Sequence, residues 1–175
     1  PAPTWQTGTG VSGTMRNVPD ISLEGDDFTG VGFIVNADFG YVDSGPWGGT
    51  SVAAPESAAM WSIVLSACKA TPSCKGPGGT YRLGNPAPLF YQIYNGTTPF
   101  TATSYPSTFY DVVSGNNGVI PCLANPNQLG PCPNPEPTPD AGFNAGVGYD
   151  QVTGIGVPFT GHLINAVVNP ATPVN

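Results

Sequence analysis

Apolar residues are grouped along the chain into short runs, and glycine, proline and small polar residues separate these runs. The run 31–36 (VGFIVN) predicts a strand, with 39–42 as its partner in a hairpin. The stretch 16–23 (RNVPDISL) predicts a further short, buried strand. Longer apolar segments predict helices at about 51–67, 86–94 and 160–168. Because short strands alternate with helices, we expect an α/β architecture.

The remaining residues predict turns and loops, chiefly over 1–14, 68–80 and most of 95–140. A length of 175 residues is sufficient for one domain with a real core. We find no internal repeat and no domain linker, and therefore expect 1–175 to form a single segment.

Composition narrows the class of protein. The chain has 4 basic and 11 acidic residues, which gives a net charge of −7 and argues against nucleic-acid binding. An acidic chain with few lysines suits an acid habitat. No run approaches the roughly 20 apolar residues that a membrane span needs.

Four cysteines lie in two close pairs, and these pairs indicate disulfides. We favour Cys68–Cys74 and Cys122–Cys132, although four cysteines allow three pairings. A zinc site is the alternative, but the spacings are not of the CxxC type. Disulfides would indicate an oxidising compartment.

The segment 48–55 (GGTSVAAP) places a serine where a glycine-rich turn enters the amino end of a helix, which we expect to be buried. The amino end of a helix carries unpaired N–H groups and a partial positive charge. Ser51 could therefore attack a carbonyl group while nearby N–H groups stabilise the oxyanion. The alternative is that Ser51 only caps the helix.

A second group of residues suggests a cation site. Asp111 follows two aromatic residues, and Asp150 ends the run Gly146-Val147-Gly148-Tyr149-Asp150. Two carboxylates, with glycines that free backbone carbonyl groups, are typical of calcium ligands. The alternative is that both aspartates cap turns.

Together these motifs resemble the sedolisins, or serine-carboxyl peptidases. The matching segments occur in the family's order: 3–6 (PTWQ), 16–22 (RNVPDIS), 49–55 (GTSVAAP), 109–115 (FYDVVSG), 146–150 (GVGYD) and 153–156 (TGIG). The resemblance implies a subtilisin-like α/β fold with a calcium-binding loop region. The resemblance also implies that residues 48–67 form the loop and helix of the nucleophile, and that residues 109–156 form the calcium-binding region.

The resemblance also implies residue roles. Ser51 would be the nucleophile of a secreted peptidase that hydrolyses peptide or protein substrates at acid pH. One structural Ca²⁺ would be bound by the carboxylates of Asp111 and Asp150 and the backbone carbonyl groups of Val112, Gly146 and Gly148. A glutamate supported by an aspartate would be the general base, since a carboxylate titrates at acid pH and a histidine does not.

The family's Glu/Asp pair and oxyanion aspartate have no match in this sequence. The chain therefore resembles the C-terminal half of the catalytic domain, and an N-terminal segment, which could be a separate processed chain, would supply these groups. The family pattern assigns no catalytic role to the acids nearest Ser51 in sequence, namely Glu24, Asp26, Asp43 and Glu56.

Two other functions stay open. The single histidine, His162, could complete a hydrolase triad with Asp111, Asp140 or Asp150, but the G-x-S-x-G motif of α/β-hydrolases is missing. Alternatively, the chain could be a catalytically inactive, calcium-stabilised secreted structural or binding module.

Overall fold

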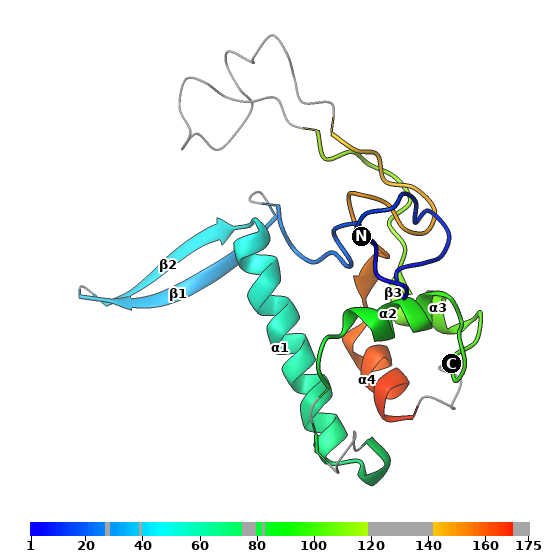
Figure 1. Cartoon of the computed structure of the whole chain (residues 1–175). Helices are drawn as coiled ribbons and strands as arrows, with labels where there is room; N and C mark the ends of the chain where they lie inside the picture. The colour runs from blue at the N-terminus through cyan, green and yellow to red at the C-terminus, as the bar shows by residue number, and fades with distance from the viewer. Residues whose placement is uncertain (27–28, 39, 75–79, 82, 119–141, 170–175) are drawn as a thin grey trace. The chain divides into compact units, whose positions relative to one another are not determined.

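The computed structural model describes residues 1–26, 29–38, 40–74, 80–81, 83–118 and 142–169 (Figure 1). The chain divides into two compact units. The first unit comprises Pro1–Ser22, Ala59–Asn116 and Asn144–Asn175, and the second comprises Leu23–Ala58 and Asn117–Phe143. Both helices and strands are present, as the α/β prediction requires, and the described strands form two antiparallel pairs.

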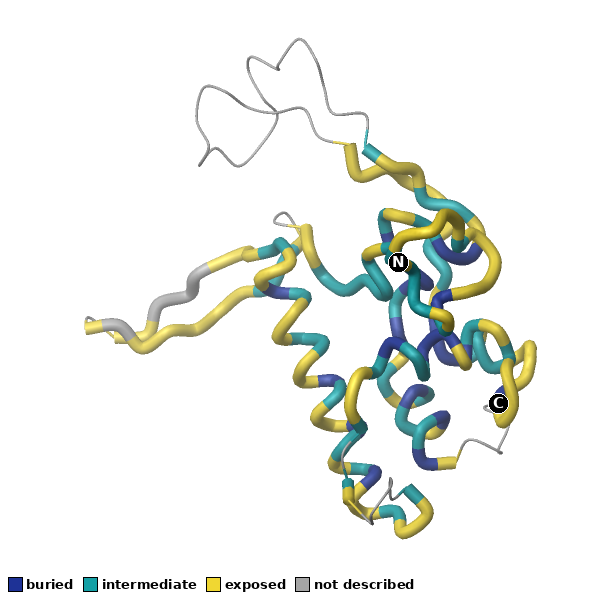
Figure 2. Tube along the Cα trace, viewed as in Figure 1, coloured by how far each residue is buried: buried dark blue, intermediate teal, exposed yellow. Residues whose placement is uncertain are grey.

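The second unit contains the predicted hairpin. Strands β1 (Val31–Ala37) and β2 (Gly40–Trp47) pair antiparallel, with Ala37 opposite Gly40 at the tip and a bulge between Val31 and Phe33. Successive residues of a strand face opposite sides, and the neighbours Phe33 and Ile34 are 46% and 77% exposed. Apolar side chains on both faces of the hairpin are therefore exposed (Figure 2).

Helix α1 (Thr50–Lys69) follows the hairpin and confirms the predicted helix. Pro55 is the sixth residue of this helix, where its missing N–H group removes one i→i−4 hydrogen bond. We expected this helix to be buried, and only one of its faces is. Val52, Met60, Val64 and Cys68 are buried at spacings that place them on one face, whereas most of the other positions are exposed or half-buried.

The first unit is built on a core of large apolar side chains from helices α2 (Ala87–Tyr94) and α4 (Thr160–Val168), both of which were predicted. Phe90 and Tyr91 of α2 and Leu163 of α4 are almost completely buried. Phe90 meets Phe109 edge-on, with ring centroids 5.6 Å apart. These residues place α2, α4 and Phe109 around one apolar core.

The shorter elements of the first unit were not predicted. Helix α3 (Ser104–Thr108) and strand β3 (Phe109–Tyr110) lie in a region that we expected to consist mostly of turns. Strand β3 pairs antiparallel with β4 (Val157–Pro158). Strands of two residues carry too little periodicity to be recognised in a sequence.

The predicted strand at 16–23 is wrong. This segment forms no strand, and it is bound instead by separate hydrogen bonds to the loop 153–156. Ile155 N donates to Asp20 O (2.8 Å), and Ser22 N donates to Gly156 O (3.1 Å). Pro19 has no N–H group, and its presence reduces the number of hydrogen bonds that a ladder could form.

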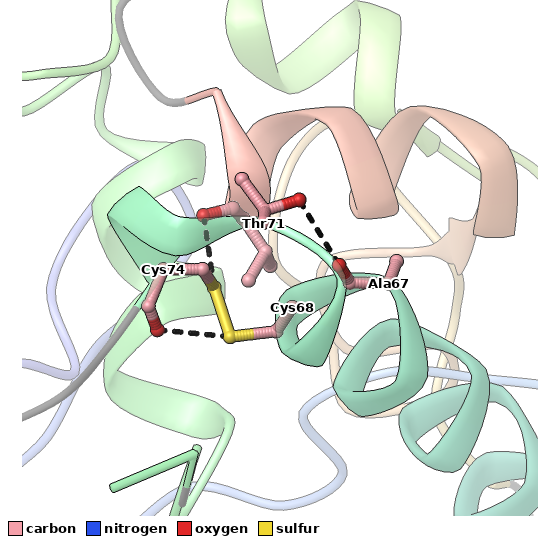
Figure 3. Close-up of a disulfide and its surroundings, with 5 residues drawn as sticks. Ala67, Cys68, Thr71 and Cys74 are labelled. Carbon is pink, nitrogen blue, oxygen red and sulfur yellow. Dashed lines mark hydrogen bonds between the residues drawn. A yellow bond between two sulfur atoms is a disulfide. The ribbon is translucent and has the colours of Figure 1, made fainter. Parts of the chain in front are cut away.

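The first cysteine pair is confirmed. Cys68, near the end of α1, forms a disulfide with Cys74 at the end of the short 3₁₀-helix η1 (Pro72–Cys74) (Figure 3). Just before η1, Thr71 Oγ1 donates to Ala67 O (3.0 Å) and so satisfies a carbonyl group in the last turn of α1. The predicted pair Cys122–Cys132 lies outside the described residues. Among the described helices, none has the length and hydropathy required to cross a bilayer.

Candidate functional site

Ser51 is the second residue of α1 and its side chain is exposed. Strand β2 ends at Trp47, and the turn at Gly48-Gly49 connects it to the helix. Gly49 has φ +80°, a conformation that side chains other than glycine's adopt at a cost. The carbonyl oxygen of Gly49 accepts hydrogen bonds from Val52 N (3.0 Å) and Ala53 N (3.3 Å).

These bonds make Gly49 the capping residue of α1, because its carbonyl group accepts the first bonds of the helix. Ser51 is therefore already within the first turn, and the interpretation of Ser51 as the helix cap is wrong. Its hydroxyl lies in the turn where backbone N–H groups have no partner within the helix. This is a suitable position for a nucleophile that requires an adjacent positive electrostatic potential.

Asp111 directly follows β3 and is half-buried. Its Oδ2 accepts a hydrogen bond from Gly148 N (2.8 Å). Its Oδ1 is buried and has no hydrogen-bond partner among the described residues. An anionic oxygen that is shielded from water and unpaired is costly, so a further partner at this oxygen would stabilise the fold.

Asp150 accepts several hydrogen bonds from backbone N–H groups. Its Oδ2 accepts from Gly146 N (3.0 Å), and its Oδ1 accepts from Val152 N (2.8 Å) and Thr153 N (2.7 Å). Asp150 thereby closes its own turn, as the capping alternative requires. The carboxylates of Asp111 and Asp150 are thus both bound to the loop 146–148.

Oxygen atoms of the kind that Ca²⁺ binds lie in this region, namely two carboxylates and the backbone carbonyl groups beside them. Ca²⁺ takes six to eight oxygen ligands, among which backbone carbonyl groups are common. The described residues contain no group of three or more His, Cys, Asp or Glu side chains suited to a metal, so carbonyl groups would have to complete the set. Val112 is adjacent to Asp111, and Gly146 and Gly148 form the loop that both carboxylates bind. The unpaired Oδ1 of Asp111 is the observation that favours a cation.

A cavity of about 310 Å³ lies beside Asp111 and Gly148. Tyr94 and Tyr105 also line it. Burial raises the pKa of Tyr105, and the negative charge of Asp111 raises this pKa further. Burial likewise raises the pKa of Tyr94. Sequence analysis missed both tyrosines, because no motif distinguishes them from the other aromatic residues of the core.

Ser51 and the five predicted calcium ligands belong to different compact units. Ser51 lies in the unit that contains the hairpin, and the ligands lie in the unit that contains α2 and α4.

The alternative roles for histidine and cysteine lose support. Nδ1 of His162 pairs with the backbone carbonyl oxygen of Ser107, which links the first turn of α4 to α3. This contact accounts for His162 as a structural residue. Cys68 and Cys74 form a disulfide and are not free to bind zinc. Asp140 lies outside the described residues.

Comparison with known proteins gives three relatives. The chain is 32% identical to sedolisin of Pseudomonas sp. (strain 101) over 156 residues, which are 88% of this chain and 19% of the relative. It is 25% identical to kumamolisin of Bacillus sp. (strain MN-32) over 183 residues, with 98% of this chain and 24% of the relative covered. It is 28% identical to xanthomonalisin of Xanthomonas sp. (strain T-22) over 155 residues, with 89% and 13% covered.

The chain therefore belongs to the sedolisin family, of which it matches a C-terminal part. It spans between 13% and 24% of the length of these relatives. No protein-family model matches the chain.

Proposed function

We propose that this chain is the C-terminal part of a subtilisin-like serine-carboxyl peptidase that hydrolyses peptide bonds at acid pH. The observation that carries the proposal is an exposed serine in the first turn of α1, after a glycine turn, in a chain of the sedolisin family. Peptides or proteins are the substrates. An acid, oxidising, extracellular compartment agrees with the net charge of −7 and with the Cys68–Cys74 disulfide.

In the proposed reaction, Ser51 Oγ attacks the carbonyl carbon of the scissile peptide bond. The proton of the hydroxyl passes to a general base, and the tetrahedral intermediate collapses to an acyl-enzyme with loss of the amine. Water then hydrolyses the ester and regenerates Ser51. The resemblance assigns the base to a glutamate supported by an aspartate, and a further aspartate to the oxyanion site. We place these three acids in an N-terminal segment of the peptidase that binds this chain.

The test is Ser51→Ala in the full-length protein, assayed with a peptide substrate at pH 3–5. Loss of a serine nucleophile lowers kcat by roughly 10⁶-fold, that is, to background in most assays. Ser57→Ala is the matched control, because it removes a hydroxyl from the same helix, where Ser57 Oγ only donates to Ala53 O (2.9 Å). We expect full activity in the control and an unchanged circular dichroism spectrum in both variants. Retained turnover in Ser51→Ala would exclude Ser51 as the nucleophile.

We further propose one structural Ca²⁺, bound by the carboxylates of Asp111 and Asp150 and the carbonyl oxygens of Val112, Gly146 and Gly148. The ion would neutralise two carboxylates that share one loop, and so stabilise the fold. A ligand present at 100 times its Kd stabilises a protein by about 2.7 kcal/mol. Chelation with EDTA should therefore lower the melting temperature.

Asp150→Lys should reproduce the effect of chelation and make the melting temperature insensitive to EDTA. Asp38→Asn is the control, because Asp38 is an exposed acid in the other compact unit. A wild-type melting temperature that EDTA does not change would refute the calcium site.

An inactive, calcium-stabilised secreted module is the second candidate. It is supported by the loop 146–148, whose N–H groups bind the carboxylates of both Asp111 and Asp150, an arrangement that requires no catalytic residue. A fluorophosphonate that labels active serines separates the two functions. Stoichiometric labelling of Ser51 supports the peptidase, and absence of labelling in the full-length protein supports the module.

A further inference from the structure

Two tyrosines hold the loop that contains Asp150, one on each side of that aspartate. Tyr94, the last residue of α2, accepts a hydrogen bond at its hydroxyl from Tyr149 N (2.8 Å). Tyr105, from α3, donates a hydrogen bond from its hydroxyl to Ile155 O (2.9 Å). The residues that flank the turn of Asp150 are thus fixed to two different helices.

The two rings also support each other. Tyr94 and Tyr105 meet edge-to-face, with ring centroids 4.6 Å apart and planes at 84°. The Tyr94 hydroxyl additionally donates to Thr9 O, and Thr9 O in turn accepts from Tyr149 N (3.1 Å). Tyr94 therefore joins the amino-terminal loop to the loop of Asp150. We call Tyr94 and Tyr105 the tyrosine pair.

The backbone of the loop fits closely against the tyrosine pair. Gly148 is buried and has φ +79°, and a Cβ atom at this position would lie 2.4 Å from Tyr94 Oη. The hydroxyl of Tyr94 thus occupies the space of a side chain at 148. The N–H group of the same glycine donates to Asp111 Oδ2. The position of Tyr94 therefore affects the peptide that binds Asp111.

The tyrosine pair also borders the cavity into which Asp111 faces, together with Gly148. Groups that hold metal ligands in place are tuned by their own hydrogen bonds, and removing such a bond weakens metal affinity 10- to 100-fold in typical cases. A loop that is already in its bound conformation spends less free energy on ordering when the ligand binds.

We propose that Tyr94 and Tyr105 are positioning residues of the calcium loop, and that their hydroxyl groups set its affinity for Ca²⁺. This inference rests on the calcium site proposed above. It adds a role for two residues that contribute no ligand and that lie outside every motif of the family resemblance. Without the hydroxyl groups, the loop 146–156 would retain its ligands but lose the bonds that hold it in the binding conformation.

The experiment measures the Kd for Ca²⁺ by calorimetric titration of the chelator-treated full-length protein, in the wild type, Tyr94→Phe and Tyr105→Phe. Each variant keeps its ring and loses one hydroxyl, so we expect a Kd roughly 10-fold weaker in each. Tyr91→Phe is the matched control. It removes a hydroxyl from the same helix, but that hydroxyl accepts from Gln6 Nε2 (2.9 Å), and among the described residues it makes no hydrogen bond to the backbone of the loop 146–156. We expect the control to lower the melting temperature without calcium and to leave the Kd unchanged.

The possible outcomes separate the two proposals. If the wild type binds no Ca²⁺, both the calcium site and the positioning role are refuted. If the wild type binds Ca²⁺ and both variants of the tyrosine pair bind it equally well, only the positioning role is refuted. A similar loss of affinity in Tyr91→Phe would also refute it, because the effect would then reflect general stability. Weaker binding confined to Tyr94→Phe and Tyr105→Phe supports it.

Discussion

Gly154 packs against backbone that cannot easily move, and we predict that Gly154→Ala strongly destabilises the protein. Gly154 is buried with φ +62°, and an added Cβ would lie 2.2 Å from Asp20 O and 2.3 Å from Asp20 C. Asp20 O is also held by Ile155 N at 2.8 Å. The added methyl group would have to displace a main-chain segment rather than a flexible side chain.

The expected loss of unfolding free energy in Gly154→Ala has two contributions. A left-handed conformation costs a residue other than glycine roughly 1–2 kcal/mol. Overpacking of a filled site costs roughly 1–3 kcal/mol more. We therefore expect the free energy of unfolding to fall by roughly 2–5 kcal/mol.

Urea unfolding followed by circular dichroism measures this change. Gly161→Ala is the control, because Gly161 is exposed in the first turn of α4 and an added Cβ would meet nothing within 4 Å. Alanine is favoured over glycine in a helix by roughly 0.5–1 kcal/mol, so the control should be neutral or slightly stabilising. A Gly154→Ala protein within about 0.5 kcal/mol of the wild type, the range of ordinary surface substitutions, would refute the reasoning.

Two further predictions concern the disulfide and the buried tyrosines. Cys74→Ala removes a disulfide between residues six apart in sequence, and loop entropy predicts that the free energy of unfolding falls by about 2 kcal/mol. A reducing agent should destabilise the wild type but not the variant. Equal sensitivity of both proteins to the reducing agent would contradict this first prediction. Burial and the charge of Asp20 raise the pKa of Tyr149 to about 12, whereas the pKa of tyrosine in the unfolded chain is about 10. The stability that the neutral Tyr149 contributes should therefore be complete below pH 10 and should be lost as the pH rises through 12. Tyrosinate absorbance from the buried tyrosines should therefore appear together with unfolding, and ionisation of every tyrosine near pH 10 in a folded protein would contradict this second prediction.

Local sequence signals were enough to predict the hairpin and the longer helices. The hairpin, α1, α2 and α4 were predicted because each has a continuous apolar run and a clear punctuating residue, such as Pro86 before α2 or Gly49 before α1. The disulfide Cys68–Cys74 was predicted for the same reason, since its partners are close in sequence. The family was also recognisable, because the order of several short motifs is a property of the sequence alone.

Other features depend on residues that are distant in sequence. The segment 16–23 has the apolar character of a strand, but its backbone makes separate hydrogen bonds to residues distant in sequence. Asp20 O and Ser22 N bond to Ile155 N and Gly156 O, and the backbone of Asn17 bonds to the side chain of Gln6. The β3–β4 pairing joins residues 109–110 to 157–158 and has no signal in either segment. Burial of α1 was overestimated, because apolar residues occur on all sides of this helix, whereas only one of its faces is buried in the described structure.

The sequence by itself determined which residues carry the candidate chemistry: a serine after a glycine turn, and two aspartates beside glycines. These depend on residue type and short spacing, which a sequence displays directly. Only the tertiary structure decided that Gly49, and not Ser51, caps α1, and that Tyr94 and Tyr105 hold the loop of Asp150. Tyr94 contacts residues 85 and 55 positions away in sequence, and such contacts arise from packing in three dimensions and have no local pattern.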